Sequence, residues 1–181
     1  MCGIVAVIYS TGNRYDRRKL NDAVNKIVAR GPEATCVKEY AGSFFGFTRL
    51  AINGLTDAGM QPYQKGNLSW ICNGEIYNSK ELEKSLGIEH AGSDCECIGD
   101  LYMRHRDDLA TFARALDGVF ALVLYDGDLN KLIVARDPYG IRPLYIGFRP
   151  EVTPSFDSHY KYNVATYVFA SELKADRKSN V

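Results

Sequence analysis

A cysteine directly follows the initiator methionine, and this position gives its side chain unusual chemical possibilities. If Met1 is removed, Cys2 carries a thiol and an unblocked α-amino group on one residue. The thiol is a strong nucleophile, and an α-amine with a free pKa of about 7.7 can act as a general base near neutral pH. Such a residue predicts nucleophilic attack on a carbonyl group, whereas a cysteine that is merely the second residue of a strand is the plainer alternative.

An Asn-Gly pair in the middle of the chain offers a second chemical element. Splitting an amide creates an oxyanion, which neutral hydrogen-bond donors can stabilise. Asn73 supplies a side-chain amide and Gly74 an unhindered backbone N–H at the predicted end of a strand. The alternative interpretation is an ordinary turn, since Asn-Gly is a common turn sequence.

These residues need a scaffold, and the apolar patterning predicts strands at both ends of the chain with helices clustered between them. Residues 3–9 are apolar nearly throughout, as in a strand covered on both faces, so Cys2 is expected to begin a buried strand. Further strands are predicted at residues 35–40, 43–50, 68–72, 119–125, 131–136, 144–148 and 164–170, and helices at 16–29, 78–86, 93–102 and 107–116.

Several boundaries of these elements carry local signals. Asn78 with Glu81, and Ser93 with Glu96, fit the capping-box pattern at the start of two helices. Asn73-Gly74 is expected to break a strand, and residues 149–161 are expected to form a surface loop. The order of elements predicts an α+β fold with antiparallel sheets and segregated helices.

Composition narrows the classes of function. The 181 residues include 22 basic and 22 acidic side chains, so no global field favours nucleic acid or an anionic membrane. The five cysteines are odd in number and contain no pair of C-x-x-C motifs, which predicts reduced thiols in a cytoplasmic protein and no metal site. The apolar start is too short for a signal peptide, and no stretch is long enough to span a bilayer.

Seven short motifs occur in a single order along the chain. Together they resemble the glutaminase domain of class II glutamine amidotransferases, most closely that of glutamine-dependent asparagine synthetase, and the resemblance continues to residues 171–174. It implies a four-layer αββα sandwich, the fold of N-terminal-nucleophile hydrolases, as a single domain over residues 1–181 that needs no cofactor. The motifs are Met1-Cys2-Gly3-Ile4, Arg30-Gly31-Pro32, Arg49-Leu50-Ala51-Ile52, Gln61-Pro62, Asn73-Gly74-Glu75-Ile76-Tyr77-Asn78, Gly92-Ser93-Asp94-Cys95-Glu96 and residues 136–145.

The resemblance implies hydrolysis of L-glutamine to glutamate and ammonia through a thioester on Cys2, with Asn73 and Gly74 binding the oxyanion. It also implies that Arg49 binds the substrate carboxylate, for which a guanidinium offers a bidentate geometry. Asp94 is implied to bind the substrate ammonium, although an acid in the first turn of a helix is favourable in any case. The other implied pocket residues are Leu50, Ile52, Gly74 and Glu75, with Arg30 supporting the Cys2 region.

A phosphate-binding loop is missing from the sequence. The chain has neither a Ser-Gly-Gly-type loop nor a Walker-type loop, so no ATP-pyrophosphatase domain is expected within it. Ammonia is therefore expected to pass to a separate synthetase domain or subunit. Two alternatives stay open: a catalytically idle module that binds glutamine or a partner for regulation or assembly, and an amidase for another γ-glutamyl amide, which shares the amino-acid head of glutamine.

Overall fold

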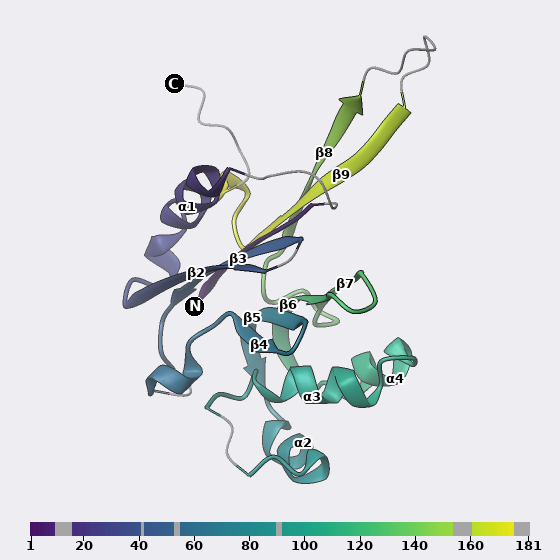
Figure 1. Cartoon of the computed structure of the whole chain (residues 1–181). Helices are drawn as coiled ribbons and strands as arrows, with labels where there is room; N and C mark the ends of the chain where they lie inside the picture. The colour runs from purple at the N-terminus through teal and green to yellow at the C-terminus, as the bar shows by residue number, and fades with distance from the viewer. Residues whose placement is uncertain (10–15, 41, 53–54, 90–91, 154–160, 176–181) are drawn as a thin grey trace.

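Two antiparallel sheets lie face to face in the computed structural model of this chain, with helices on both outer sides (Figure 1). The structure describes residues 1–9, 16–40, 42–52, 55–89, 92–153 and 161–175; for residues 149–153 and 161–165 it describes the backbone alone. None of the helices in these ranges combines the length and the apolar composition that crossing a bilayer requires.

Sheet A has the N-terminal strand at its centre. Its order is β2 (Ala34–Tyr40), β3 (Ser43–Arg49), β1 (Gly3–Ile8), β9 (Lys161–Ala170) and β8 (Tyr145–Thr153). All six residues of β1 are buried, as predicted for a strand covered on both faces. Because β1 has a hydrogen-bonded neighbour on each side, the point at which the chain enters it, just after Cys2, is fixed.

Sheet B is a shorter antiparallel array. Its order is β4 (Tyr63–Lys65), β5 (Leu68–Ile76), β6 (Gly118–Asp126) and β7 (Lys131–Arg136). β4 pairs only with residues 68–70 of β5, whereas β6 pairs with β5 along its whole length. From Ile71 onward, one edge of β5 therefore has no neighbouring strand in sheet B.

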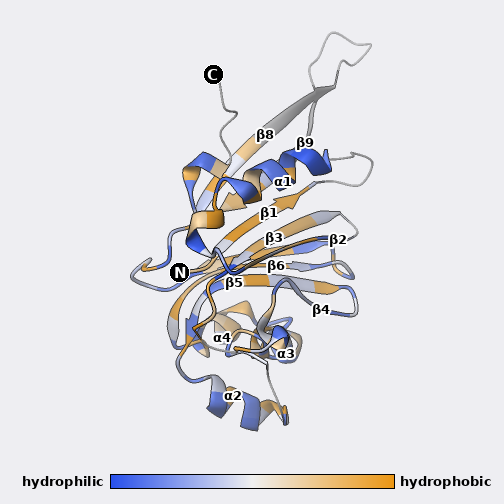
Figure 2. Ribbon diagram, turned by 90° about the vertical axis from the view of Figure 1, so that its left-hand side faces the viewer, coloured by the Kyte–Doolittle hydropathy of each residue, from blue (hydrophilic) through white to orange (hydrophobic). Residues whose placement is uncertain are grey.

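Helices complete the outer layers (Figure 2). Helix α1 (Arg17–Asn25) packs Val24 and Leu20 against sheet A, and a second apolar cluster, with Ile4, Phe47 and Ile71, fills the space between the sheets. A third cluster joins sheet B to the remaining helices. The αββα layering and the α+β class are thus confirmed. The other helices are α2 (Ser79–Leu86), α3 (Cys97–Arg104) and α4 (Leu109–Arg114), with short 3-10 turns η1 (Val28–Arg30), η2 (Asp57–Gly59) and η3 (Leu173–Ala175).

The prediction that Asn73 and Gly74 end a strand is wrong. Strand β5 continues through both residues, with Gly74 opposite Phe120 of β6. A Cβ atom on Gly74 would lie 2.3 Å from the carbonyl oxygen of Val119. Glycine is needed here for the close approach of two strands, not for a turn, and a single sequence does not distinguish these two uses.

Both predicted capping boxes are also wrong. Asn78 precedes α2, but its amide donates to the carbonyl of Ala115 at 2.9 Å and accepts from the backbone N–H of Asp117 at 3.1 Å. These bonds tie the start of α2 to the segment before β6. Ser93 lies in a turn before α3, which begins only at Cys97. Its Oγ accepts from the N–H of Cys95 at 3.4 Å, and the carboxylate of Glu96 accepts from the N–H of Gly92 rather than from that of Ser93.

Other boundaries shift modestly. The helix predicted over residues 16–29 is split into α1 and the turn η1. Both strands next to the predicted loop 149–161 extend into it, since β8 ends at Thr153 and β9 begins at Lys161. The rest of that predicted loop, residues 154–160, lies outside the described residues.

A buried carboxylate joins sheet B to its helices. Asp126, at the end of β6, is fully buried and accepts hydrogen bonds from Tyr102 Oη at 2.7 Å and from Arg106 Nε at 2.6 Å. It also accepts from the backbone N–H groups of Asp128 and Leu129. Burial alone raises the pKa of Asp126, but the bonds from Arg106 and Tyr102 outweigh it and hold the pKa at about 2.

Asp126→Asn should lower the free energy of unfolding by about 2–3 kcal/mol, because it leaves Arg106 without its buried counter-charge. Asp128→Asn is the matched control, since the Asp128 side chain is 51% exposed and contacts Arg106 at 3.2 Å; it should cost less than about 1 kcal/mol. Urea titration followed by fluorescence of the single, buried Trp70 measures both. Equal costs for the two variants would contradict the assignment.

The same carboxylate predicts an acid dependence. Its folded pKa of about 2 lies below the value of about 3.9 expected in the unfolded chain. The stabilisation is therefore present above about pH 4 and is lost as the pH falls toward 2. Over this interval, the unfolding free energy of the parent chain should fall more steeply with acid than that of Asp126→Asn.

Candidate active site

The thiol of Cys2 is held by the end of the neighbouring strand. Its Sγ accepts from the backbone N–H of Leu50 at 3.4 Å and donates to the carbonyl of the same residue at 3.4 Å. Leu50 directly follows β3, and the β1–β3 register places Gly3 opposite Thr48. The pairing of two strands in sheet A therefore determines where the sulfur lies.

Arg30 lies behind Cys2, outside the pocket lining. Its Nε donates to the carbonyl of Cys2 at 3.0 Å, and its Nη1 is 3.4 Å from Oε1 of Glu172. Its Nη2 is 4.0 Å from Sδ of Met1. The guanidinium thus connects the start of β1 to the segment that follows β9.

The open edge of β5 faces the pocket. Gln61 occupies this edge at Cys72, donating Nε2 to the Cys72 carbonyl at 3.0 Å and accepting from its N–H at 2.7 Å. Asp94 occupies it at Ile76, where Oδ2 accepts from the backbone N–H at 2.7 Å. Alternate residues of a strand direct their N–H groups to the same side. The N–H of Gly74, midway between the two, therefore points to this open edge between Gln61 and Asp94.

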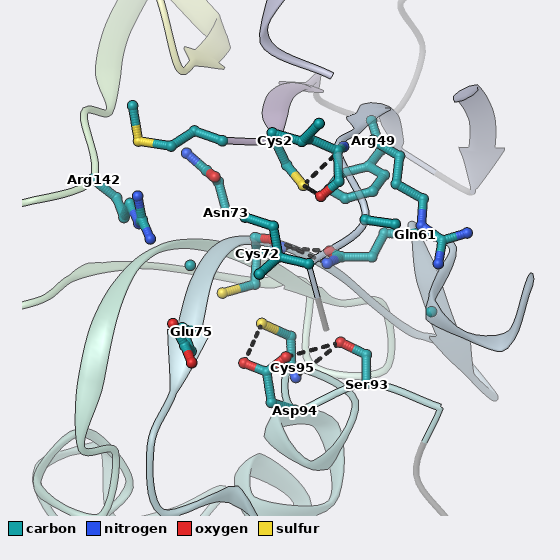
Figure 3. A pocket seen from close by; sticks show the side chains of 17 residues that line it. Cys2, Arg49, Gln61, Cys72, Asn73, Glu75, Ser93, Asp94, Cys95 and Arg142 are labelled. Atoms are coloured by element: carbon teal, nitrogen blue, oxygen red, sulfur yellow. Dashed lines mark hydrogen bonds between the residues drawn. The ribbon is translucent and has the colours of Figure 1, made fainter. Parts of the chain in front are cut away.

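Asn73 directs its side chain from β5 into the space between the two sheets. The residue is 1% exposed, and among the described residues its Nδ2 has no hydrogen-bond partner. A buried amide donor without a partner is rare in proteins, because the lost hydration is costly. Figure 3 shows Asn73 at the end of the pocket where Cys2 lies, away from Ser93, Asp94 and Cys95. The side chain is therefore free to donate to a group bound beside the thiol.

Oppositely charged groups occupy other parts of the pocket. Arg49, 7% exposed, donates Nη2 to the carbonyl of Thr56 at 2.7 Å. The carboxylate of Asp94 accepts from the hydroxyl of Ser93 at 3.1 Å and from the thiol of Cys95 at 3.7 Å, besides its bond to the β5 backbone. These contacts fix the orientation of the carboxylate while the residue continues to line the pocket.

Two further thiols, those of Cys72 and Cys95, line the pocket. A hydrogen bond with Cys72 and burial raise the pKa of the Cys95 thiol well above its ordinary value. Burial likewise raises the pKa of the nearby Cys97 thiol to about 12. A protonated thiol is a poor nucleophile, so the raised pKa values make Cys95 and Cys97 weak nucleophiles near neutral pH. All five cysteines are free thiols.

The structure brings eight of the nine residues singled out from the sequence into this single pocket. They come from the residue before β1, the end of β3 with the segment that follows it, β5, and the turn before α3. They are Cys2, Arg49, Leu50, Ile52, Asn73, Gly74, Glu75 and Asp94. Arg30, the ninth, contacts Cys2 from outside the lining. Among the described residues, no group of three His, Cys, Asp or Glu side chains could hold a metal ion.

Several pocket residues had no assigned role in the sequence analysis. Gln61, Ser93, Cys95 and Arg142 lie within the recognised motifs, but nothing in their types or spacing indicated what they contact. The bonds of Gln61 to Cys72 depend on how β4 leads into β5. The remaining unassigned lining residues are Met1, Phe47, Ala51, Gly59 and Cys72.

Comparison with known proteins gives a consistent result. Residues 1–180 match the model of a glutamine amidotransferase domain. The chain is 38% identical, over 97% of its length, to a probable glutamine-hydrolysing asparagine synthetase of Acanthamoeba polyphaga mimivirus, of which it covers 30%. It is 36% identical, over 89% of its length, to glutamine-hydrolysing asparagine synthetase 3 of Arabidopsis thaliana, covering 28% of that protein. The chain thus spans less than a third of the length of these relatives.

The two bonds of Gln61 predict a structural requirement. Gln61→Leu leaves the buried N–H and carbonyl of Cys72 without partners and should cost about 2–4 kcal/mol of unfolding free energy. Gln64→Leu is the matched control, because Gln64 is an exposed residue of β4 whose side chain donates to the exposed carbonyl of Gly66; it should cost less than about 0.5 kcal/mol. Urea denaturation measures both costs. A Gln61→Leu protein as stable as the parent would refute the structural role of the bonds between Gln61 and the Cys72 backbone.

Proposed function

Since this chain belongs to the glutamine amidotransferase domain family, we propose that it releases ammonia from the side-chain amide of L-glutamine, with Cys2 as an N-terminal nucleophile. The observation that carries the proposal is that the Cys2 thiol and Asn73, whose Nδ2 has no partner in the described part of the chain, line one pocket. The pocket also holds one deeply buried cation, Arg49, and a fixed carboxylate, Asp94.

Before any turnover, removal of Met1 frees the α-amine of Cys2. The amine takes the proton of the thiol, and the sulfur attacks the δ-carbonyl carbon of glutamine. The tetrahedral intermediate collapses when the amine returns the proton to the departing nitrogen, so ammonia leaves and a γ-glutamyl thioester remains on Cys2. Water then attacks the thioester, giving glutamate and restoring the thiol. Cys2 supplies both the nucleophile and the base, water is the second reactant, and no cofactor is proposed.

Two neutral donors support the intermediate. The negative charge forms on the former carbonyl oxygen, which Asn73 Nδ2 and the N–H of Gly74 are proposed to bind. Both groups are held in strand β5, so little reorganisation is needed when the charge forms. The unsatisfied state of Asn73 Nδ2 supports this role, since the oxyanion would be its missing acceptor.

The amino-acid head of the substrate is proposed to bind at the opposite charges. Arg49 would hold the α-carboxylate through its guanidinium, and Asp94 the α-ammonium. Leu50, Ile52, Gly74 and Glu75 are proposed to complete the pocket, and all of them line it. A pocket that binds both the α-carboxylate and the α-ammonium group favours a free amino acid as the substrate.

The ammonia is proposed to serve a synthetase. The relatives are named as asparagine synthetases, and this chain spans about 30% of the first of them. We propose that residues 1–181 form a single glutaminase domain without an ATP-pyrophosphatase domain, and that ammonia passes to a separate synthetase domain or subunit. We also propose a cytoplasmic location, which five free thiols support, and binding to neither nucleic acid nor membrane.

Glutamate formation from glutamine tests the proposal directly. Intact-mass measurement should show that the purified chain has lost Met1. The same protein should convert glutamine to glutamate and ammonia. Cys2→Ala should abolish turnover, whereas Cys36→Ala, which changes a half-buried thiol in β2, should retain it. Retention of Met1, or a folded protein that binds glutamine without hydrolysing it, would instead support an idle binding module. Faster turnover of another γ-glutamyl amide would identify a different substrate.

Asn73 provides a second test. Asn73→Ala should lower kcat about 100- to 1,000-fold, with a much smaller change in KM, because the lost bond forms mainly in the transition state. Asn67→Ala is the control, since Asn67 bonds to Asp128 at the far end of β5 and should leave both constants unchanged. A rise in KM at unaltered kcat would place Asn73 in substrate binding alone.

A further inference from the structure

A carboxylate outside the pocket is connected to Cys2 by a continuous set of contacts. We propose that Glu172 is a positioning residue for Cys2, acting through Arg30 to hold the nucleophile and to balance charge beside its α-amine. The inference rests on the proposed function, and it concerns a residue that the sequence analysis did not single out.

The contacts run from Glu172 to the backbone of the nucleophile. Oε1 of Glu172 is 3.4 Å from Nη1 of Arg30, and Nε of Arg30 donates to the Cys2 carbonyl at 3.0 Å. The Arg30 side chain is only 11% exposed, so its guanidinium is largely shielded from water. A cation in such a place depends strongly on its counter-charge. Glu172 is therefore suited to keep the guanidinium aligned with the Cys2 carbonyl.

Glu172 is itself held in place by β1, the strand that begins directly after Cys2. The preceding residue, Ser171, donates its N–H to the carbonyl of Ile4 at 3.0 Å and accepts the N–H of Ile4 on its Oγ at 3.0 Å. Ser171 is fully buried, and turn η3 begins directly after Glu172. The carboxylate therefore starts from a backbone anchored two residues away from Cys2 in β1.

The same contacts have an electrostatic consequence. In the mature chain the α-amine of Cys2 would lie on the residue whose carbonyl Arg30 binds. A nearby cation disfavours protonation of an amine, and a carboxylate beside that cation offsets the effect. The charged residues that line the pocket with Cys2 are Arg49, Glu75, Asp94 and Arg142. Glu33 accepts from the N–H of Ala51, next to the residue that contacts the thiol. Glu172→Gln removes none of these five side chains.

A neighbouring ion pair supplies a control. Glu172 Oε2 also contacts Nζ of Lys174 at 2.7 Å, but Lys174 is 54% exposed. Hydrogen bonds from Lys174 and Arg30 lower the pKa of Glu172, so the carboxylate is ionised throughout the neutral range. An exposed pair of this kind contributes little to structure. Lys174→Met therefore removes a partner of Glu172 without removing the contact to Arg30.

The experiment compares Glu172→Gln with Lys174→Met in the mature chain. Glu172→Gln should lower kcat, per titrated Cys2, about 10-fold at optimal pH. It should also move the acid-side midpoint of the pH–rate profile about half a pH unit lower, because the charge of Arg30 is no longer balanced. Lys174→Met should leave kcat and the midpoint close to parent values. A reduced kcat with an unmoved midpoint, or an equal loss in both variants, would overturn the proposal.

Two further measurements keep the outcome decisive. If urea denaturation shows that Glu172→Gln does not fold, Glu172→Asp replaces it. The retained charge should leave the midpoint of the pH–rate profile in place, while the shorter side chain lowers kcat. A parent-like kcat would overturn the proposal. If the parent chain does not hydrolyse glutamine, the proposed function fails on its own. The pH dependence of Cys2 alkylation by iodoacetamide, mapped by peptide mass, then tests for the same shift without turnover.

Discussion

The central position of β1 in sheet A is the constraint on which the rest of the site depends. β3 pairs with one side of this strand and β9 with the other, and its side chains pack against α1 on one face and sheet B on the other. A chain terminus ordinarily has freedom to move. Here the second residue of the protein enters a strand that is fixed on every side, so the thiol of Cys2 can be held by a backbone contact as slight as that to Leu50.

Sheet B contributes the complementary half of the site through an edge that sheet pairing leaves open. β4 covers only the first residues of β5, and beyond them the backbone of β5 bonds to side chains, those of Gln61 and Asp94. The N–H of Gly74 lies between these two side chains. Asp94 therefore stabilises the fold by accepting the N–H of Ile76, and the same bond orients its carboxylate in the pocket.

The two halves meet because the sheets pack face to face. Cys2, the proposed nucleophile, directly precedes β1 of sheet A, and the proposed oxyanion donors belong to sheet B, so the apolar layer of Ile4, Phe47 and Ile71 sets how far apart they lie. Asn73 is the polar side chain of β5 that enters this layer beside the pocket. Its Nδ2, which has no hydrogen-bond partner among the residues that the structure describes, is a cost to the fold, and sites prepared for a ligand commonly carry such a cost.

The sequence by itself determined the composition of the site and the class of the fold. Runs of apolar residues located every described strand except the short β4, which the sequence analysis did not predict. The ordered motifs identified the family and eight residues that prove to share a pocket. It misjudged Asn73-Gly74, Asn78 and Ser93, because glycine serves close packing as well as turns, and polar side chains near helix starts can bond elsewhere. Only the tertiary structure decided the free edge of β5, the bonds of Gln61 and the link from Glu172 through Arg30 to Cys2. These contacts join residues from 11 to 142 positions apart, and local sequence patterns contain no information on which distant groups strand pairing will bring together.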